Sequence, residues 1–235
     1  MDSSPEDSSA VPHPLRGASV LLAGATGGIG AALAEELHRR GARLVLVGRD
    51  AGRLEEMTVP GRRVPLDLRT PEACAAAVEA AIEHAGRLDV VINAVGVVAF
   101  GPMADVSVDT MEELFLTNTF VPIMLAQAAL GRMSAGGAIV NISGVIAEEN
   151  RPGMAIYGAS KAAVRSFDEA LAREARRSKI RVLDARPPHT ETGLAERPLA
   201  GTAPKLPVGL DPHHVAFTIC EALEQGVKDL PSTSF

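Results

Sequence analysis

Short apolar runs alternate along the chain with longer, alanine-rich segments. The runs are almost continuously hydrophobic, which is the pattern of parallel strands that helices cover on both faces. This pattern predicts six buried strands, at residues 19–23, 43–47, 63–66, 89–94, 138–142 and 180–185. Residues 229–235 would add only a short edge strand.

Segments of helical composition fill the intervals between these runs. They predict helices at residues 29–40, 71–84, 110–133, 154–178 and 211–224, the third interrupted near Pro122. Strands that alternate with helices predict an α/β fold in a single domain, with a doubly wound parallel sheet of the Rossmann type. Prolines, glycines and leucines at 193–210 predict an apolar, mobile loop.

Composition and charge narrow the classes of partner. Residues 1–16 lack the basic start and apolar centre of a signal peptide, and we interpret them as a disordered polar tail before a domain spanning 17–235. The net charge of -6, without a lysine or arginine run, argues against nucleic acid and anionic membranes as partners. No apolar run approaches the length that crosses a bilayer. Cys74 and Cys220 lack metal-ligand spacing, so we expect free thiols, a cytoplasmic protein and no metal site.

The first predicted strand runs directly into a glycine-rich turn, and helical composition resumes at Ala31. A backbone that turns sharply beside a pyrophosphate needs residues without Cβ, and free N–H groups at the start of the next helix attract the anion. An ordinary strand-to-helix turn is the alternative. The candidate phosphate-binding residues are Gly24, Thr26, Gly28, Ile29 and Gly30.

Two further motifs accompany this turn. Asn93-Ala94-Val95-Gly96 ends the fourth strand, and Tyr157-x-x-x-Lys161 lies in the helix after the fifth. Together with the spacing G-x-x-x-G-x-G, they make residues 18–192 resemble the short-chain dehydrogenase/reductase family. The resemblance implies a Rossmann fold, hydride transfer between NADP or NAD and a small carbonyl or alcohol substrate, and a homo-oligomer.

The end of the second strand bears on the choice of dinucleotide. An NAD site usually presents a carboxylate here and an NADP site a cation, and this chain has Gly48 followed by Arg49. Arg49 could bind a 2′-phosphate, so we favour NADP, although Gly27 replaces the second basic residue of many NADP-binding relatives. A solvated surface charge is the alternative for Arg49. Asp50 is interpreted as the N-cap of a helix that begins at Ala51.

The adenosine side of the site is expected at the ends of the third and fourth strands. By resemblance, Asp67 and Leu68 hold the adenine ring, through a carboxylate and a backbone contact. Asp67 could instead cap the turn before the next helix. The resemblance also places Asn93, Ala94 and Gly96 along the adenosine side, where Gly96 would allow close approach of the cofactor.

Tyr157 and Lys161 are the central catalytic candidates. A spacing of four residues puts the phenol and the ammonium on one face of a helix. A phenol with a pKa of about 10 is a poor acid-base group at neutral pH, and a neighbouring cation lowers that pKa. The resemblance makes Tyr157 the acid/base and gives Lys161 a second task at the nicotinamide ribose. A solvated Tyr–Lys pair is the alternative.

Two more residues match positions of the family. Asn118 matches an asparagine that kinks its helix and holds a water on the proton path to the lysine, although a buried asparagine bonded to backbone is the alternative. Thr192 matches a threonine that contacts the nicotinamide carboxamide. Pro188 replaces the glycine usual before that threonine, which leaves the geometry of the turn open.

The chain departs from the family at the catalytic serine. That serine is the second of a Ser-Ser pair after the fifth strand, and the pair here reads Ser143-Gly144. Ser143 is a catalytic candidate if a positive φ at Gly144 turns its hydroxyl toward a substrate carbonyl, and its loss would then lower turnover about hundredfold. Glu148 and Glu149 are interpreted as loop charges, since a carboxylate would repel an oxyanion.

Two functions are compatible with these residues. The favoured one is a carbonyl reductase or alcohol dehydrogenase in which Tyr157 moves the proton, acting on an apolar substrate near the loop at 193–210. The other, motivated by Gly144, is a dinucleotide-binding protein with little turnover that acts as a redox-responsive or scaffolding partner. Turnover of a ketone panel discriminates between them.

Overall fold

The computed structural model describes residues 14–235. Most of the expected tail, residues 1–16, therefore lies outside the described residues. At its end, however, Leu15 is fully buried in the core, and its carbonyl accepts a hydrogen bond from the Ala18 amide at 3.0 Å. The folded domain thus includes Leu15, which the expected boundary at residue 17 left out.

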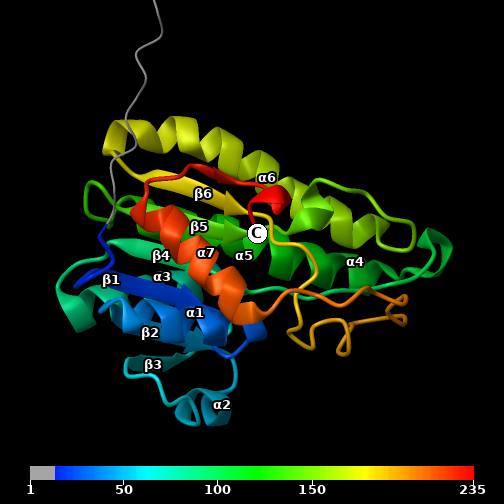
Figure 1. Ribbon diagram of the computed structural model, residues 1–235, viewed down its shortest axis with the longest axis horizontal. Coiled ribbons are helices and arrows are strands. Elements are labelled where there is room, and N and C mark those ends of the chain that lie inside the picture. Colours follow the sequence, from blue (N-terminus) through cyan, green and yellow to red (C-terminus); the bar gives the residue numbers. More distant parts are fainter. Residues whose placement is uncertain (1–13) are drawn as a thin grey trace, which may run out of the picture.

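One sheet of seven parallel strands forms the centre of the molecule, in the order β3-β2-β1-β4-β5-β6-β7 (Figure 1). All six predicted strands are confirmed, with ends that shift by at most one residue, and the expected edge strand is two residues long. The strands are β1 (Ser19–Ala23), β2 (Arg43–Gly48), β3 (Arg62–Pro65), β4 (Val90–Asn93), β5 (Ala138–Ile142), β6 (Arg181–Ala185) and β7 (Asp229–Leu230).

Helices cover both faces of this sheet. They are α1 (Gly28–Arg39), α2 (Ala51–Glu55), α3 (Pro71–Ala85), α4 (Val108–Phe115), α5 (Val121–Leu130), α6 (Ala155–Glu174) and α7 (Pro212–Glu224). Helices α1 and α7 pack side by side on one face, and α3, α5 and α6 pack on the other (Figure 1). This arrangement confirms the predicted doubly wound sheet.

The central strand shows why the strand sequences are continuously apolar. Neighbouring side chains of a strand point to opposite faces. On β1, Val20 and Leu22 belong to the core beneath α1 and α7, whereas Leu21 and Ala23 belong to the core beneath α3 and α5. Both faces of the strand are therefore buried.

A π-helical turn, η2 (Leu116–Phe120), separates α4 from α5 where the sequence predicts an interruption. Pro122 has no N–H to donate to the carbonyl four residues earlier, that of Asn118. The hydrogen bonding widens at this point, because the Val121 amide donates to the carbonyl of Leu116, five residues back. The turn carries Asn118, which is fully buried.

Together, α4, η2 and α5 form a helix, Val108–Leu130, that is long and apolar enough to cross a membrane by those two criteria alone. The expectation that no segment reaches such a length is therefore wrong. Half of the most apolar window of this helix is buried within the fold, where Leu125 and Ala129 belong to the core under α3. The helix thus packs as a core helix does.

Parallel strands end on the same side of the sheet, and the order of this sheet reverses between β1 and β4. Ligand sites of doubly wound sheets lie beyond the carboxyl ends of the strands at such a point. The irregular segments that follow β4, β5 and β6 gather at this end of the sheet (Figure 1).

Candidate active site

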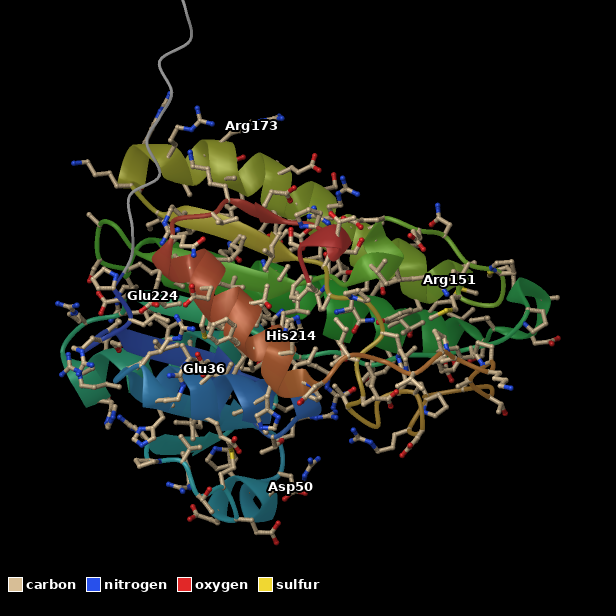
Figure 2. The ribbon with its side chains drawn as sticks, in the orientation of Figure 1. Glu36, Asp50, Arg151, Arg173, His214 and Glu224 are labelled. Carbon is tan, nitrogen blue, oxygen red and sulfur yellow. The ribbon has the colours of Figure 1, made fainter. Side chains whose placement is uncertain are left out.

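A cavity of about 620 Å³ opens at the carboxyl ends of the strands. The candidate residues from the sequence line it, except Gly30, Asn93 and Asn118, which are buried. Arg151 also lines the cavity, and Figure 2 labels it at the end of the molecule where the loop at 193–210 lies. Side chains that the sequence did not single out also line the wall: Val98, Phe100, Ile146 and Met154.

The glycine turn has no room for side chains. Gly24 has a φ of +78°, and a Cβ there would lie 2.8 Å from the carbonyl of Ala94. A Cβ on Gly30 would lie 2.0 Å from the carbonyl oxygen of Gly24, and one on Gly28 would lie 2.5 Å from the Cβ of Thr192. No side chain caps the N-terminus of α1, so the turn and the helix start form a backbone-lined cradle.

Two guanidinium groups follow β2. Arg49 is exposed and lines the cavity. Asp50 caps α2 as predicted, because its carboxylate accepts a hydrogen bond from the Arg53 amide at 3.1 Å. The guanidinium of Arg53 also lines the cavity and donates to the carbonyl of Thr26 at 2.6 Å. The sequence analysis missed Arg53, although its place one helical turn after Arg49 was available as a signal.

Asp67 lines the cavity and caps a turn at the same time. Its Oδ1 accepts the Arg69 amide at 3.2 Å, and its Oδ2 lies 2.9 Å from the Nε of Arg69. The Arg69 guanidinium lowers the pKa of Asp67 below its usual value. Leu68 is buried beside it. Both interpretations of Asp67 are thus compatible with the geometry.

Helix α6 presents Tyr157 and Lys161 to the cavity, one turn apart. The Nζ of Lys161 donates to the carbonyl of Ile142, at the end of β5, at 2.8 Å. Burial lowers the pKa of Lys161 to about 8, while Asp184 opposes that shift. Burial raises the pKa of Tyr157 to about 12, because desolvation penalises the phenolate. The lowered phenol pKa expected from a neighbouring cation is therefore wrong for this structure.

The segment after β4 lies against Lys161. Asn93 is buried, and its Oδ1 accepts the Val95 amide at 3.3 Å. The Ala94 amide donates to the carbonyl of Ala23 on β1 at 2.9 Å. A Cβ on Gly96 would lie 3.4 Å from the Nζ of Lys161, an ordinary contact distance, so this glycine lies directly beside the lysine without being required there.

Asn118 connects the segment after β4 to α6. Its Oδ1 accepts the Val97 amide at 2.9 Å, and its Nδ2 donates to the Val97 carbonyl at 2.9 Å and to the Ser160 hydroxyl at 3.0 Å. The Ser160 hydroxyl donates to the carbonyl of Tyr157 at 2.8 Å. The side chain thus matches the alternative interpretation, a buried asparagine bonded largely to backbone.

Ser143 is fully buried, and its hydroxyl donates to the Oδ1 of Asp184, on β6, at 2.5 Å. A hydroxyl has one proton to donate, and this one is bound by a carboxylate. Gly144 does adopt a positive φ, of +80°, yet that conformation leaves the Ser143 hydroxyl on Asp184. The geometry therefore disagrees with the interpretation of Ser143 as the donor to a substrate carbonyl.

Thr192 lies over the glycine turn, since a Cβ added to Gly28 would come within 2.5 Å of the Thr192 Cβ. Its amide donates to the carbonyl of Thr190 at 2.8 Å, and its hydroxyl accepts the Leu194 amide at 3.3 Å. Just before Thr192 in the chain, the Thr190 hydroxyl donates to the carbonyl of Pro188 at 2.9 Å. The Pro-Pro sequence therefore still brings Thr192 to the cavity.

The loop at 193–210 is tied to the segment after β4. The Leu199 amide donates to the carbonyl of Val98 at 2.8 Å, and the Phe100 amide donates to the carbonyl of Ala200 at 3.0 Å. Leucine and valine side chains of the loop line the cavity, namely Leu194, Leu206, Val208 and Leu210. These side chains give the loop an apolar surface toward the cavity.

Asp184 and Arg186 are buried, and with the half-buried Glu148 they form a charged cluster that is not among the candidates from the sequence. The sequence does contain a signal for this cluster, because Asp184 interrupts an apolar strand and Arg186 is the first residue after that strand. Burial of charged residues in such a run points to pairing with opposite charge.

Comparison with known proteins identifies the family. The family model for short chain dehydrogenases matches residues 18–201. Dehydrogenase/reductase SDR family member 7B of Bos taurus is 33% identical over 238 residues, covering 92% of this chain and 73% of that protein. The chain belongs to the short-chain dehydrogenase/reductase family, whose members are nicotinamide-dependent oxidoreductases.

Solved structures agree with the fold. A short chain dehydrogenase from Burkholderia cenocepacia, in complex with NADP, superposes with a TM-score of 0.83 at 24% identity, over 94% of this chain and 99% of that one. A blue fluorescent protein from a metagenomic library, in complex with NADPH, has a TM-score of 0.81 at 26% identity, over 93% and 97%.

Proposed function

We propose that the protein transfers a hydride between a nicotinamide dinucleotide and a small carbonyl or alcohol compound, with Tyr157 as the acid/base. The position of Tyr157 and Lys161 on one face of α6, in the same cavity as the glycine turn, carries this proposal. The bound cofactor supplies or accepts the hydride. The residues of the chain bind, orient and move a proton.

NADP is the dinucleotide that we favour, with NAD as the alternative. Structural relatives hold NADP or NADPH in two cases and NAD in a third, so they support a nicotinamide dinucleotide without separating the two. Arg49, with Arg53 one turn further on, offers cations to a 2′-phosphate. The cradle fits a pyrophosphate, because the glycine turn carries no side chains and no side chain caps the N-terminus of α1. The remaining residues of the proposed cofactor site are Gly24, Thr26, Ile29, Gly30, Asp67, Leu68, Asn93, Ala94, Gly96, Tyr157, Lys161 and Thr192.

The protonation state of the site suits reduction of a carbonyl group. A pKa of about 12 keeps the Tyr157 phenol protonated at neutral pH, so its Oη can donate a proton to the substrate oxygen. The Lys161 ammonium, held on the Ile142 carbonyl, stabilises the phenolate that remains. With a pKa of about 8, Lys161 carries that charge at neutral pH.

Ser143 is left out of this mechanism because its hydroxyl binds Asp184. The Tyr157 phenol then both polarises and protonates the substrate oxygen. Asn118 is a positioning residue, since it fixes the segment after β4 to α6 beside Tyr157.

The substrate end of the cavity indicates the class of substrate. Apolar side chains from three segments line it, including Phe100, Ile146 and Leu206. We infer an apolar carbonyl or alcohol compound, since a cavity of this composition favours apolar surface. A cytoplasmic location and a homo-oligomeric state are part of the same proposal and rest on the family and on the composition.

The proposal is tested by following NADPH absorbance with four carbonyl compounds: cyclohexanone, acetophenone, benzaldehyde and benzil. We expect steady NADPH consumption that depends on the carbonyl compound and yields an equal amount of alcohol. NADPH binding, measured by fluorescence, without turnover of any of the four would instead support the dinucleotide-binding protein that Gly144 motivates.

A further inference from the structure

A buried arginine directly after β6 binds three carboxylates from three parts of the chain. The Arg186 side chain is only 3% exposed. Its Nη1 lies 2.6 Å from Asp184 and 2.7 Å from Asp229, and its Nε donates to Glu148. Burial opposes the charge, but the hydrogen bonds with these carboxylates raise the pKa of Arg186 above its usual value. The guanidinium therefore stays charged and links β6, β7 and the loop after β5.

Two hydroxyls extend these contacts. The Ser143 hydroxyl donates to the Oδ1 of Asp184 at 2.5 Å, and the Ser232 hydroxyl donates to the Oε2 of Glu148 at 2.6 Å. Ser232 begins the 3₁₀ turn η5 (Ser232–Ser234), and Ser232 and Thr233 line the cavity. A continuous chain of hydrogen bonds thus runs from the end of β5 through Arg186 to the cavity wall.

Two features hold η5 to the rest of the fold: Phe235, which packs against the core, and this chain of hydrogen bonds. The Arg186 amide donates to the Leu230 carbonyl at 3.0 Å, in the strand before η5, and the Ser234 amide donates to the Pro231 carbonyl at 2.9 Å, within the turn itself. The Ser232 side chain connects the turn to Glu148. Glu148 itself follows the 3₁₀ turn η3 (Val145–Ala147), which supplies the cavity residues Val145 and Ile146.

We propose that Arg186 and Glu148 are positioning residues that set η5 against η3 and thereby determine the affinity for the carbonyl substrate. Neither side chain lines the cavity, so both act through Ser232 and its neighbour Thr233. The inference rests on the proposed function in one respect, the identity of the substrate as a carbonyl compound.

The molecule contains a matched control for this network. The Arg40 side chain, 8% exposed, also binds three carboxylates, with Nε 2.6 Å from Glu36 and Nη1 2.8 Å from Glu221, and with Glu224 as the third partner. Figure 2 labels Glu36 on α1 and Glu224 on the neighbouring α7. None of these residues lines the cavity. Glu36→Gln therefore removes a comparable ion pair at a distance from the substrate.

The test compares Glu148→Gln and Arg186→Lys with Glu36→Gln in the full chain. Hydrogen exchange of peptides that cover 229–235 reports the position of η5 without any turnover. Steady-state kinetics with the best carbonyl compound of the panel above separate KM from kcat, and fluorescence titration gives the NADPH affinity. Circular dichroism establishes that each variant is folded.

In Glu148→Gln and Arg186→Lys, we expect exchange of the 229–235 peptides to accelerate and the KM to rise, each about tenfold, the scale of one lost hydrogen bond to a charged group. NADPH affinity and kcat should stay within about twofold. Glu36→Gln should leave both exchange and KM at the wild-type values. If Arg186→Lys does not fold, Glu148→Gln decides.

Unchanged exchange and KM in folded Glu148→Gln would overturn the inference, as would an equal effect of Glu36→Gln. If the wild-type protein reduces none of the four carbonyl compounds, the proposed function fails, and the exchange of 229–235 alone then decides whether the network positions η5. The two failures are therefore distinguishable.

Discussion

Replacement of Ser143 by alanine separates the two roles considered for this residue. The side chain is fully buried, and its one proton is donated to Asp184, which also binds Arg186. A hydrogen bond to a charged group contributes about 1.5–3 kcal/mol, so the variant should lose about 2 kcal/mol of unfolding free energy. For a domain of this size that loss lowers the thermal midpoint by about 4–8 °C.

Ser19→Ala is the matched control for this prediction. Ser19 lies on β1, is also fully buried, and within residues 14–235 its hydroxyl has no hydrogen-bond partner. Removing an unpaired buried hydroxyl costs nothing in lost hydrogen bonds and relieves its desolvation. We therefore expect the thermal midpoint of Ser19→Ala to equal or exceed that of the wild-type protein.

The assays are a thermal melt by circular dichroism and turnover of the best carbonyl compound with NADPH. The account predicts that Ser143→Ala melts earlier and keeps kcat within about tenfold, whereas loss of an oxyanion donor lowers kcat about 100- to 1,000-fold. An unchanged midpoint together with a hundredfold fall in kcat would refute our reasoning, and it would restore Ser143 as the donor to the substrate carbonyl.

Three further predictions concern the cofactor site and the lysine. Arg49→Ala should weaken NADPH binding about tenfold or more and leave NADH binding unchanged in fluorescence titrations. The control is Arg43→Ala, at the other end of β2, which should change the affinity for neither dinucleotide. Equal losses of NADPH and NADH affinity in Arg49→Ala would contradict the assignment. Gly28→Ala should weaken NADPH binding by a similar factor because its Cβ would lie 2.5 Å from the Thr192 Cβ, and unaltered affinity would show that the cradle is misplaced. Because Lys161 is charged below its pKa of about 8, kcat/KM for reduction should be flat from about pH 6 to 7.5 and fall above about pH 8, and a profile flat to about pH 10 would argue against its role.

The fold was predictable because its elements are specified locally. A strand buried on both faces must be apolar throughout, as residues 19–23 are, and the prediction for β1 matches the structure at both ends. Pro122 likewise predicts an interrupted helix, because a proline has no backbone N–H to donate. The start of the domain was misplaced because Leu15 lies next to a segment rich in serine, proline and acidic residues, and its burial depends on tertiary contacts.

The fate of Ser143 was not predictable from the sequence, because its partner Asp184 is 41 residues away. Register between β5 and β6 brings the two together, and no local pattern encodes it. The pKa of Tyr157 depends in the same way on tertiary structure, because desolvation in the folded chain is the cause of its rise. Motif spacing thus indicates which residues meet at the site, whereas tertiary contacts decide where each hydroxyl points and which proton it holds.

Tyr157→Phe tests the central claim most directly, since it removes one oxygen and keeps the ring in the cavity. The measurements are kcat for the best carbonyl compound and the NADPH dissociation constant, both in the wild-type protein and in the variant. The account predicts a fall in kcat of at least about hundredfold, the contribution of a positioned acid, with NADPH affinity within about twofold. Turnover within about tenfold of the wild-type rate would mean that another group donates the proton, and it would contradict the assignment of Tyr157.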